Sequence, residues 1–161
     1  MKVIVSDTTS LIALEGLQAL DLLCAVFDSI LIPHAVLNEL VAGSPDIIHK
    51  IKATACIEII RLEPSEQLSS LQFVLDAGEA EAITLALERQ LPILIDERKG
   101  RAIAQQKHLI VTGFAGLLLL AIRKSVLQPV SAQALLDQAI RNGFRMSDKL
   151  YQQVLAAYRV G

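Results

Sequence analysis

Aromatic residues and long hydrophobic runs are scarce in this sequence. Aromatic side chains make up 4% of the 161 residues, and tryptophan is absent. With so few rings, a platform on which unpaired bases stack is poorly supported. The most hydrophobic segment, residues 114–122, is far shorter than the roughly 20 residues of a membrane-spanning helix. We therefore expect no membrane partner.

The net charge is small, and the sequence contains only two cysteines. The formal net charge of −2 argues against simple electrostatic coating of nucleic acid or membrane, but it leaves a local basic patch open. Cys24 and Cys56 lie in apolar segments with no second pair of metal ligands nearby. We expect buried free thiols in a reducing compartment rather than a zinc site. The chain enters an apolar strand at once, without a signal peptide, which predicts a cytoplasmic location.

What the sequence does contain is a regular alternation of short apolar strands and helical segments. Strands are predicted at 3–5, 29–32, 57–60, 93–95 and 109–111. The run 3–5 lacks polar alternation, so it should be buried on both faces, as in a parallel sheet covered by helices. The pattern predicts an α/β fold with three α/β/α layers and a central parallel sheet of four or five strands.

The end of the chain departs from this alternation. After residue 127 the pattern is purely helical, with helices predicted over 131–141 and 147–158. No repeat or linker divides the chain. We expect one domain over residues 1–161, with 126–161 as a C-terminal helical extension. The apolar stripe of the last helix either packs on the chain's own core or mediates a contact with a partner.

Acidic residues follow two of the predicted strands directly. Asp7 ends the first strand, and Asp96 and Glu97 end the fourth. In open α/β sheets, ligands bind at the carboxyl ends of the strands. Two buried strands that deliver carboxylates to one edge therefore suggest a common site. The competing interpretation is that Asp7 only caps the helix that follows it.

Two helical glutamates are candidates for the same site. Glu39 borders the buried stripe of its helix, although a solvated glutamate explains it equally well. Glu79 projects to the same side as the buried positions of its helix, whereas Glu81 projects almost opposite, toward solvent. Asp76 precedes Glu79 with the spacing of a capping box, so Glu79 is either a metal ligand or a helix cap.

Converging carboxylates repel one another unless a cation neutralises them. All-oxygen ligation without His or Cys favours Mg²⁺ or Mn²⁺. Such ions orient a phosphodiester, ionise the attacking water and stabilise the leaving oxygen, which is the chemistry of a metal-assisted nuclease.

Basic and hydroxyl side chains near these acids are candidates for substrate binding. Arg98, Lys99 and Arg101 stand at a helix start, where the helix dipole disfavours cations. A polyanionic backbone crossing the acids would benefit from them, although a solvated helix start is an equal alternative. Thr8 and Ser10, beside Asp7, are further candidates.

Several segments resemble the PIN-domain family, including those around Asp7, Glu39 and Glu79 and the run from Leu94 to Arg98. The likeness extends over residues 1–124, and residues 143–147 resemble a prokaryotic PIN-like subgroup. The resemblance implies Mg²⁺- or Mn²⁺-dependent cleavage of RNA. It assigns Asp7 and Glu39 to the first two acids, Glu79 to a third that is usually aspartate, and Asp96 or Glu97 to the fourth.

The resemblance also implies partners. Many small prokaryotic members are VapC-like toxins that a cognate antitoxin neutralises, so we expect an RNA substrate, an antitoxin and a homodimer. The alternative within the family is a catalytically weak or inactive binding module that acts through protein contacts. A phosphoacceptor domain fits less well, because no second acid follows Asp7 and no lysine follows Val111.

Overall fold

Five short strands form one parallel sheet in the computed structural model, which describes residues 2–161. The strands are β1 (Val3–Ser6), β2 (Ser29–Pro33), β3 (Ile57–Ile60), β4 (Ile93–Leu94) and β5 (Val111–Thr112). Their spatial order is β3-β2-β1-β4-β5, and every neighbouring pair is parallel. The predicted parallel sheet is confirmed, with five strands.

The last strand begins later than the predicted 109–111. His108 adopts a left-handed φ of 65°, and the Leu109 N–H donates to the Ala104 carbonyl. These residues therefore still belong to the turn that ends the preceding helix. Pairing with β4 starts at Ile110, whose carbonyl accepts from the Ile93 N–H.

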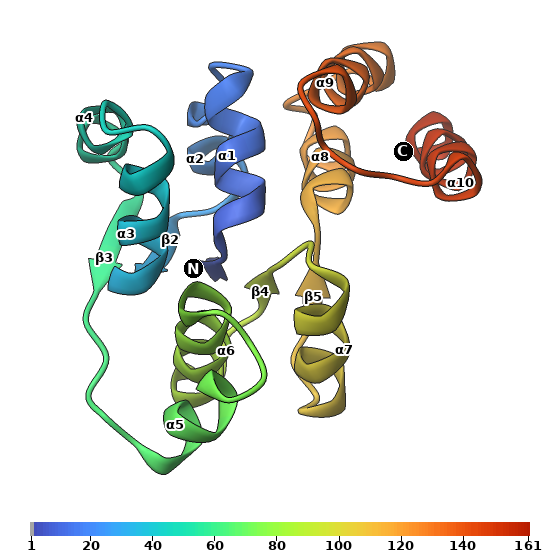
Figure 1. Cartoon of the computed structure of the whole chain (residues 1–161). Coiled ribbons are helices and arrows are strands. Elements are labelled where there is room, and N and C mark those ends of the chain that lie inside the picture. The colour runs from blue at the N-terminus through green and yellow to red at the C-terminus, as the bar shows by residue number, and fades with distance from the viewer. Residues whose placement is uncertain (1) are drawn as a thin grey trace.

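Helices cover both faces of the sheet (Figure 1). Those whose buried residues join one core are α1 (Thr8–Gly16), α2 (Asp21–Val26), α3 (His34–Gly43), α4 (Ile47–Ala53), α8 (Phe114–Arg123), α9 (Pro129–Arg141) and α10 (Asp148–Val160). Those of the other core are α5 (Glu66–Gln72), α6 (Ala77–Arg89) and α7 (Arg98–Gln106). Across residues 2–161, none of the helices combines the length and the apolar character needed to cross a membrane.

The central strand β1 shows why three layers form. Ile4 and Val5 are both fully buried, but Ile4 belongs to the first core and Val5 to the second. Successive side chains of a strand point to opposite faces, so an uninterrupted apolar strand needs a helical layer on each side. The α/β/α architecture predicted from these runs is confirmed.

The last two helices pack against α8, as Figure 1 shows. Leu155 and Tyr158 are buried in the first core. The Tyr158 hydroxyl donates to the Ala115 carbonyl at 2.8 Å, and the rings of Phe144 and Phe114 meet edge to face with centroids 5.2 Å apart. Most of the apolar stripe of α10 is therefore used within the chain, while Leu150 remains 46% exposed.

The cysteines differ from the expectation of free thiols. Cys24 in α2 and Cys56 before β3 form a disulfide with a Cα separation of 5.5 Å. The reason is tertiary: β2 follows α2 and pairs with β3 in register from Ile30 with Ile57. That pairing brings Cys56 next to α2, although 32 residues separate the two cysteines in sequence.

Candidate active site

Asp7 and Asp96 lie at the carboxyl edge of the sheet, which we call the acidic edge. This edge includes the point where the strand order reverses. From the central strand β1, the chain builds β2 and β3 on one side and β4 and β5 on the other. The Asp7 N–H donates to the Leu94 carbonyl at 2.9 Å, which fixes the end of β1 beside the end of β4. Asp7 and Asp96 thus share the carboxyl edge at the topological switch point, where this kind of sheet binds ligands.

Asp7 is a buried carboxylate that does not cap its helix. It occupies the residue before α1, yet its side chain makes no capping hydrogen bond. The residue is 2% exposed, and its Oδ1 has no hydrogen-bond partner within the described residues. Burial raises the pKa of Asp7 to about 7, aided by nearby carboxylates that include Asp76 and Glu39, while the Thr8 backbone opposes the rise. Capping does not explain this residue.

Glu79 is the second buried carboxylate. It projects inward from the start of α6, as predicted, and is 6% exposed. The Asp76 side chain accepts from the Glu79 N–H at 2.8 Å, so Asp76 is the cap of α6. Glu79 Oε2, by contrast, has no partner among residues 2–161. Burial, a hydrogen bond with Asp76 and the charges of Asp76, Asp7 and Glu97 raise the pKa of Glu79 to about 8.

Glu39 lies on α3 with both carboxylate oxygens hydrogen-bonded. The Thr8 hydroxyl donates to Oε2 at 2.6 Å, and the Gly78 N–H donates to Oε1 at 2.9 Å. These donors come from the starts of α1 and α6. The glutamate expected at the border of the buried face therefore joins three helices at the acidic edge.

Asp96 is the acid that faces this edge, and Glu97 is exposed. The Ser10 hydroxyl donates to Asp96 Oδ2 at 2.5 Å, and the Phe114 N–H at the start of α8 lies 3.0 Å from Oδ1. Burial raises the pKa of Asp96, although these two donors and the charge of Arg101 lower it. Glu97 contributes through its charge alone, as one of the groups that raise the pKa of Glu79.

Three of the four acids lie against a glycine of a neighbouring segment. The pairs are Gly78 with Glu39, Gly100 with Glu79, and Gly113 with Asp96. A Cβ atom added at Gly100 or Gly113 would lie 2.5 Å from a carboxylate oxygen, and one added at Gly78 would overlap Glu39 more closely still. The acids reach the common edge because these positions carry no side chain.

Comparison with known families agrees with this fold. A family model described as a PIN domain matches residues 3–159. The chain belongs to the PIN-domain family. PIN domains are generally nucleases and typically use divalent metal ions. The match extends through α9 and into α10, so both C-terminal helices fall within the family model. A comparison with curated proteins finds no match.

The PIN-domain acids fit a divalent ion by their chemistry. In the part of the chain that the structure describes, no three His, Cys, Asp or Glu side chains converge closely enough to hold an ion as they stand. The donors are nevertheless all carboxylates, and buried oxygens of Asp7 and Glu79 have no partner. Hard oxygen donors of this kind suit Mg²⁺ or Mn²⁺.

The predicted substrate contacts lie around these acids in different ways. Arg98 and Arg101 line a groove beside Asp96, whereas Lys99 is exposed and is not part of that lining. The hydroxyls of Thr8 and Ser10 donate to site carboxylates rather than facing solvent. Their observed role is to orient Glu39 and Asp96.

Two acids behave differently from the sequence expectation. Glu81 was expected to face solvent, but it accepts from the Ala35 N–H at 3.1 Å and so caps the start of α3. Asp76, expected only as a helix cap, also raises the pKa of Asp7 and Glu79. In sequence, its only signal was its position three residues before Glu79.

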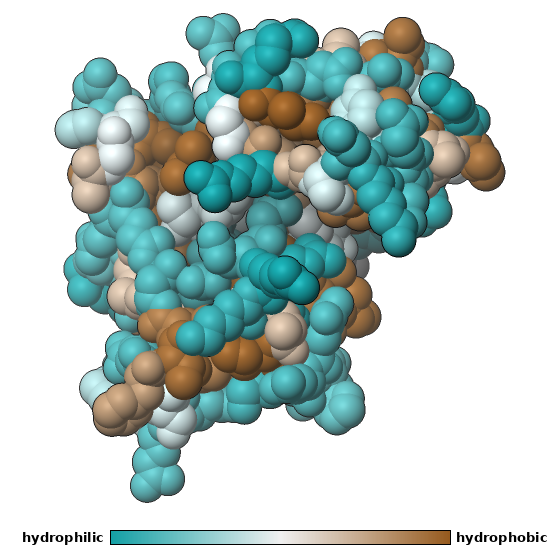
Figure 2. Space-filling model, turned by 45° about the vertical axis from the view of Figure 1, so that its right-hand side comes forward, coloured by the Kyte–Doolittle hydropathy of each residue, from teal (hydrophilic) through white to brown (hydrophobic). Residues whose placement is uncertain are grey.

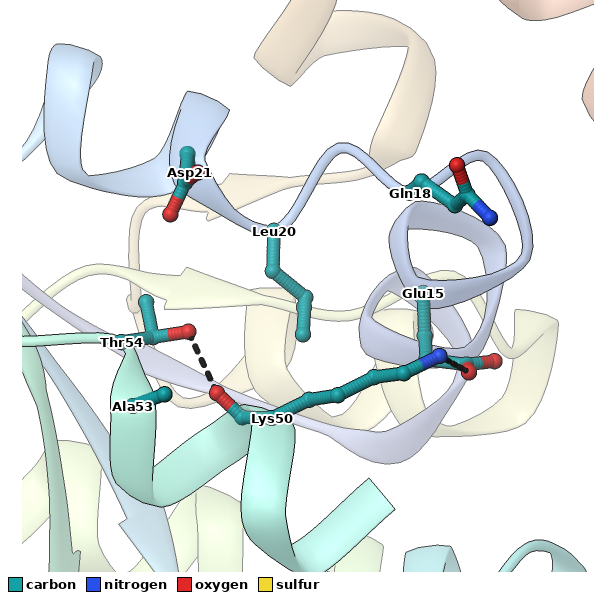
Figure 3. A pocket seen from close by; sticks show the side chains of 7 residues that line it. All are labelled: Glu15, Gln18, Leu20, Asp21, Lys50, Ala53 and Thr54. Carbon is teal, nitrogen blue, oxygen red and sulfur yellow. Dashed lines mark hydrogen bonds and ion pairs between the residues drawn. The ribbon is translucent and has the colours of Figure 1, made fainter. Parts of the chain in front are cut away.

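A second cavity, of about 370 Å³, lies at the other end of α1 (Figure 3). The ion pair between Lys50 and Glu15, 2.6 Å long, spans its lining. Glu15 stands eight residues after Asp7, which at 1.5 Å per helical residue is about 12 Å along the helix. This cavity is therefore separate from the acidic edge.

Proposed function

We propose that this PIN-domain protein is an endoribonuclease that depends on Mg²⁺ or Mn²⁺. The observation that carries the proposal is the pair of buried oxygens, Asp7 Oδ1 and Glu79 Oε2, that have no hydrogen-bond partner within residues 2–161. Burying an ionised carboxylate without a partner is costly. A bound cation supplies the missing partner, so an arrangement that is unfavourable alone becomes a binding site.

The four acids divide the work of such a site. Asp7 and Glu79 present free oxygens to the ion. Glu39 and Asp96 add negative charge that acts on Asp7, and their own hydrogen bonds keep them in position. If these acids hold a divalent ion, that ion would supply water activation and stabilisation of the leaving oxygen in phosphodiester hydrolysis.

The substrate we propose is RNA, held through its phosphates. Arg98 and Arg101 line the groove next to Asp96. Guanidinium groups bind phosphate oxygens in bidentate geometry, so these residues can draw the backbone across the acids. Lys99, which lies outside the groove, would act only by its general charge.

Incubation with mixed RNAs tests the proposal. Wild-type protein should cleave them in Mn²⁺ and not in EDTA, and Asp7→Asn should abolish cleavage. Asp148→Asn is the matched control, because Asp148 is an exposed aspartate in the first turn of α10. Cleavage that persists in EDTA, or that survives in Asp7→Asn, would exclude the proposed site.

The second candidate is a PIN-like binding module without catalysis. The observation that favours it is the absence, among the described residues, of three ligands already grouped around an ion position. A module of this kind should show neither Mn²⁺-dependent cleavage nor a gain in melting temperature with Mn²⁺. The ribonuclease should show both.

The biological setting we propose follows the small prokaryotic PIN toxins that the sequence resembles. A cognate antitoxin would bind this chain, and the chain would form a homodimer. Light scattering of the purified protein measures directly whether the chain forms a homodimer, and a strictly monomeric chain would contradict that proposal.

A further inference from the structure

A groove of about 490 Å³ runs from the acidic edge toward the C-terminal helices. Asp96 and Gly113 form its end at the site, and residues 144–146 and α10 form its far wall. The volume falls within the roughly 300–1,000 Å³ of typical small-ligand sites. The groove therefore continues the candidate active site and has room for a group adjacent to the reacting one.

The far wall of the groove is apolar apart from Arg145. Its apolar residues are Phe144, Met146, Leu150 and Val154. Phe144 is held by its edge-to-face contact with Phe114, and Leu150 is 46% exposed although it belongs to a helix with an otherwise buried stripe. This wall offers a fixed ring and accessible aliphatic surface to a flat, partly apolar group.

Three arginines also line the groove. Arg98 and Arg101 come from α7, and Arg145 comes from the segment that precedes α10. The Arg101 guanidinium donates to the Ile95 carbonyl at 2.9 Å. Within residues 2–161 the one ion pair is formed elsewhere, by Lys50. Arg101 acts on Asp96, since its charge lowers the pKa of that carboxyl, whereas Arg98 and Arg145 form no ion pair among those residues. Their combined charge suits a phosphate group.

We propose that this groove binds the unpaired nucleotide next to the scissile phosphate of a single-stranded RNA. Arg145 and Arg98 hold that nucleotide's phosphate, and the wall around Phe144 and Leu150 receives its base. The inference rests on the proposed ribonuclease function and adds to it substrate-binding residues outside the acidic edge. Arg145, from the C-terminal extension, thereby becomes a substrate-binding residue that the acidic edge alone does not reveal.

Single-stranded RNA fits the groove better than a duplex does. A base can enter a pocket only when it is unpaired and splayed out of its stack. The face shown in Figure 2 is mostly hydrophilic, with separate hydrophobic patches rather than one continuous apolar surface.

Binding in EDTA tests the groove independently of cleavage. A fluorescent single-stranded RNA should bind wild-type protein more tightly than a duplex of the same sequence. Arg145→Ala should weaken binding about tenfold, as expected for the loss of a charged hydrogen bond, and should reduce the salt-dependence slope by about 0.7. Arg141→Ala is the matched control, because Arg141 is exposed on α9 and contacts Gln138 rather than the groove.

The apolar wall has its own test. Leu150→Ala should weaken binding of the single strand severalfold without changing the salt slope, because it removes contact with a base and not with a phosphate. Val130→Ala is the control, since Val130 is 76% exposed on α9 and lies outside the groove. Because Leu150 and Val130 are exposed, both substitutions should leave the fold intact.

The outcomes separate this inference from the proposed function. RNA cleavage in Mn²⁺ with unchanged binding by Arg145→Ala and Leu150→Ala would overturn the groove and leave the ribonuclease standing. The same holds if wild-type protein prefers the duplex or binds no RNA in EDTA. Groove-dependent binding of single strands without any cleavage would support the groove and overturn the catalytic proposal.

Discussion

The acidic edge contains two kinds of carboxylate. Glu39 and Asp96 accept hydrogen bonds from hydroxyls and backbone N–H groups. Asp7 and Glu79 are buried, and each has one oxygen without a partner among the described residues. The first pair is held in place by the protein, whereas the second pair lacks the partners that buried charges require.

Burial is the largest cause of a raised pKa in Asp7, Glu79 and Asp96 alike. Hydrogen bonds from Ser10 and Phe114 lower the pKa of Asp96 and so oppose the rise that burial causes. The pKa values of Asp7 and Glu79 rise to about 7 and about 8. A cation would reverse these shifts, because a nearby positive charge favours the ionised form.

The largest expected effect comes from removing the charge of a buried carboxylate that has an oxygen without a hydrogen-bond partner among the described residues. Glu79→Gln should lower Mn²⁺ affinity by about 100-fold or more, since loss of a direct ligand should exceed the 10- to 100-fold cost of a supporting residue. Titration calorimetry with Mn²⁺ measures it. Glu81→Gln is the control, because a glutamine can still accept the Ala35 N–H that Glu81 now accepts. Equal affinity in the two variants would remove Glu79 from the site.

A smaller effect should follow from filling the space beside Glu79. In Gly100→Ala the new Cβ would lie 2.5 Å from Glu79 Oε2 and 2.7 Å from Ile95 Cδ1. Overpacking of this kind costs about 1–3 kcal/mol, and displacement of Glu79 should weaken Mn²⁺ binding by about tenfold.

Gly43→Ala is the control for this substitution, because nothing lies within 4 Å of the added Cβ. It should leave metal affinity unchanged and leave the melting temperature equal or slightly higher. If Gly100→Ala behaves the same way, then Glu79 does not depend on the space beside Gly100.

Loss of one hydrogen bond to Asp96, which accepts several, should have a milder effect. Ser10→Ala removes the hydroxyl that donates to Asp96 Oδ2, while the Phe114 N–H still reaches both oxygens. We expect a loss of about 1–3 kcal/mol in unfolding free energy, as for a buried acceptor that loses one donor, and only a severalfold drop in Mn²⁺-dependent cleavage. Abolished cleavage would place Ser10 at the same level of importance as Asp7.

The disulfide should not affect the site at all. Cys24→Ser combined with Cys56→Ser should lower the unfolding free energy by about 2–4 kcal/mol, because the bond connects α2 to the start of β3. The rise in melting temperature on adding Mn²⁺ should stay as large as in wild-type protein. A smaller rise would show that the bond supports the acidic edge.

Sequence patterns predicted the parts of the site that depend on local structure. An uninterrupted apolar strand followed by an acid was enough to place Asp7 and Asp96 at one edge. Helical phase was enough to turn Glu79 inward. Both rules follow from the geometry of single strands and helices, which the order of residues determines directly.

Contacts between distant segments were not predictable in this way. The choice between Asp96 and Glu97 depends on the start of α8, because the Phe114 N–H reaches Asp96 from 18 positions away. Glu81 was expected in solvent, but it caps α3 across 46 positions. The buried oxygens of Asp7 and Glu79 that lack a partner among the described residues result from the packing of several segments together, and no local pattern encodes them.

The most direct test of this account is the melting temperature from pH 5 to pH 8.5, in EDTA and in Mn²⁺. Because the folded chain raises the pKa values of Asp7 and Glu79 from 3.8 and 4.5 to about 7 and about 8, it binds more protons than the unfolded chain across that window. Stability in EDTA should therefore fall as the pH rises. Mn²⁺ should remove most of the fall in wild-type protein and have no effect in Asp7→Asn. Wild-type curves that coincide in EDTA and Mn²⁺ would contradict a cation site at these two carboxylates.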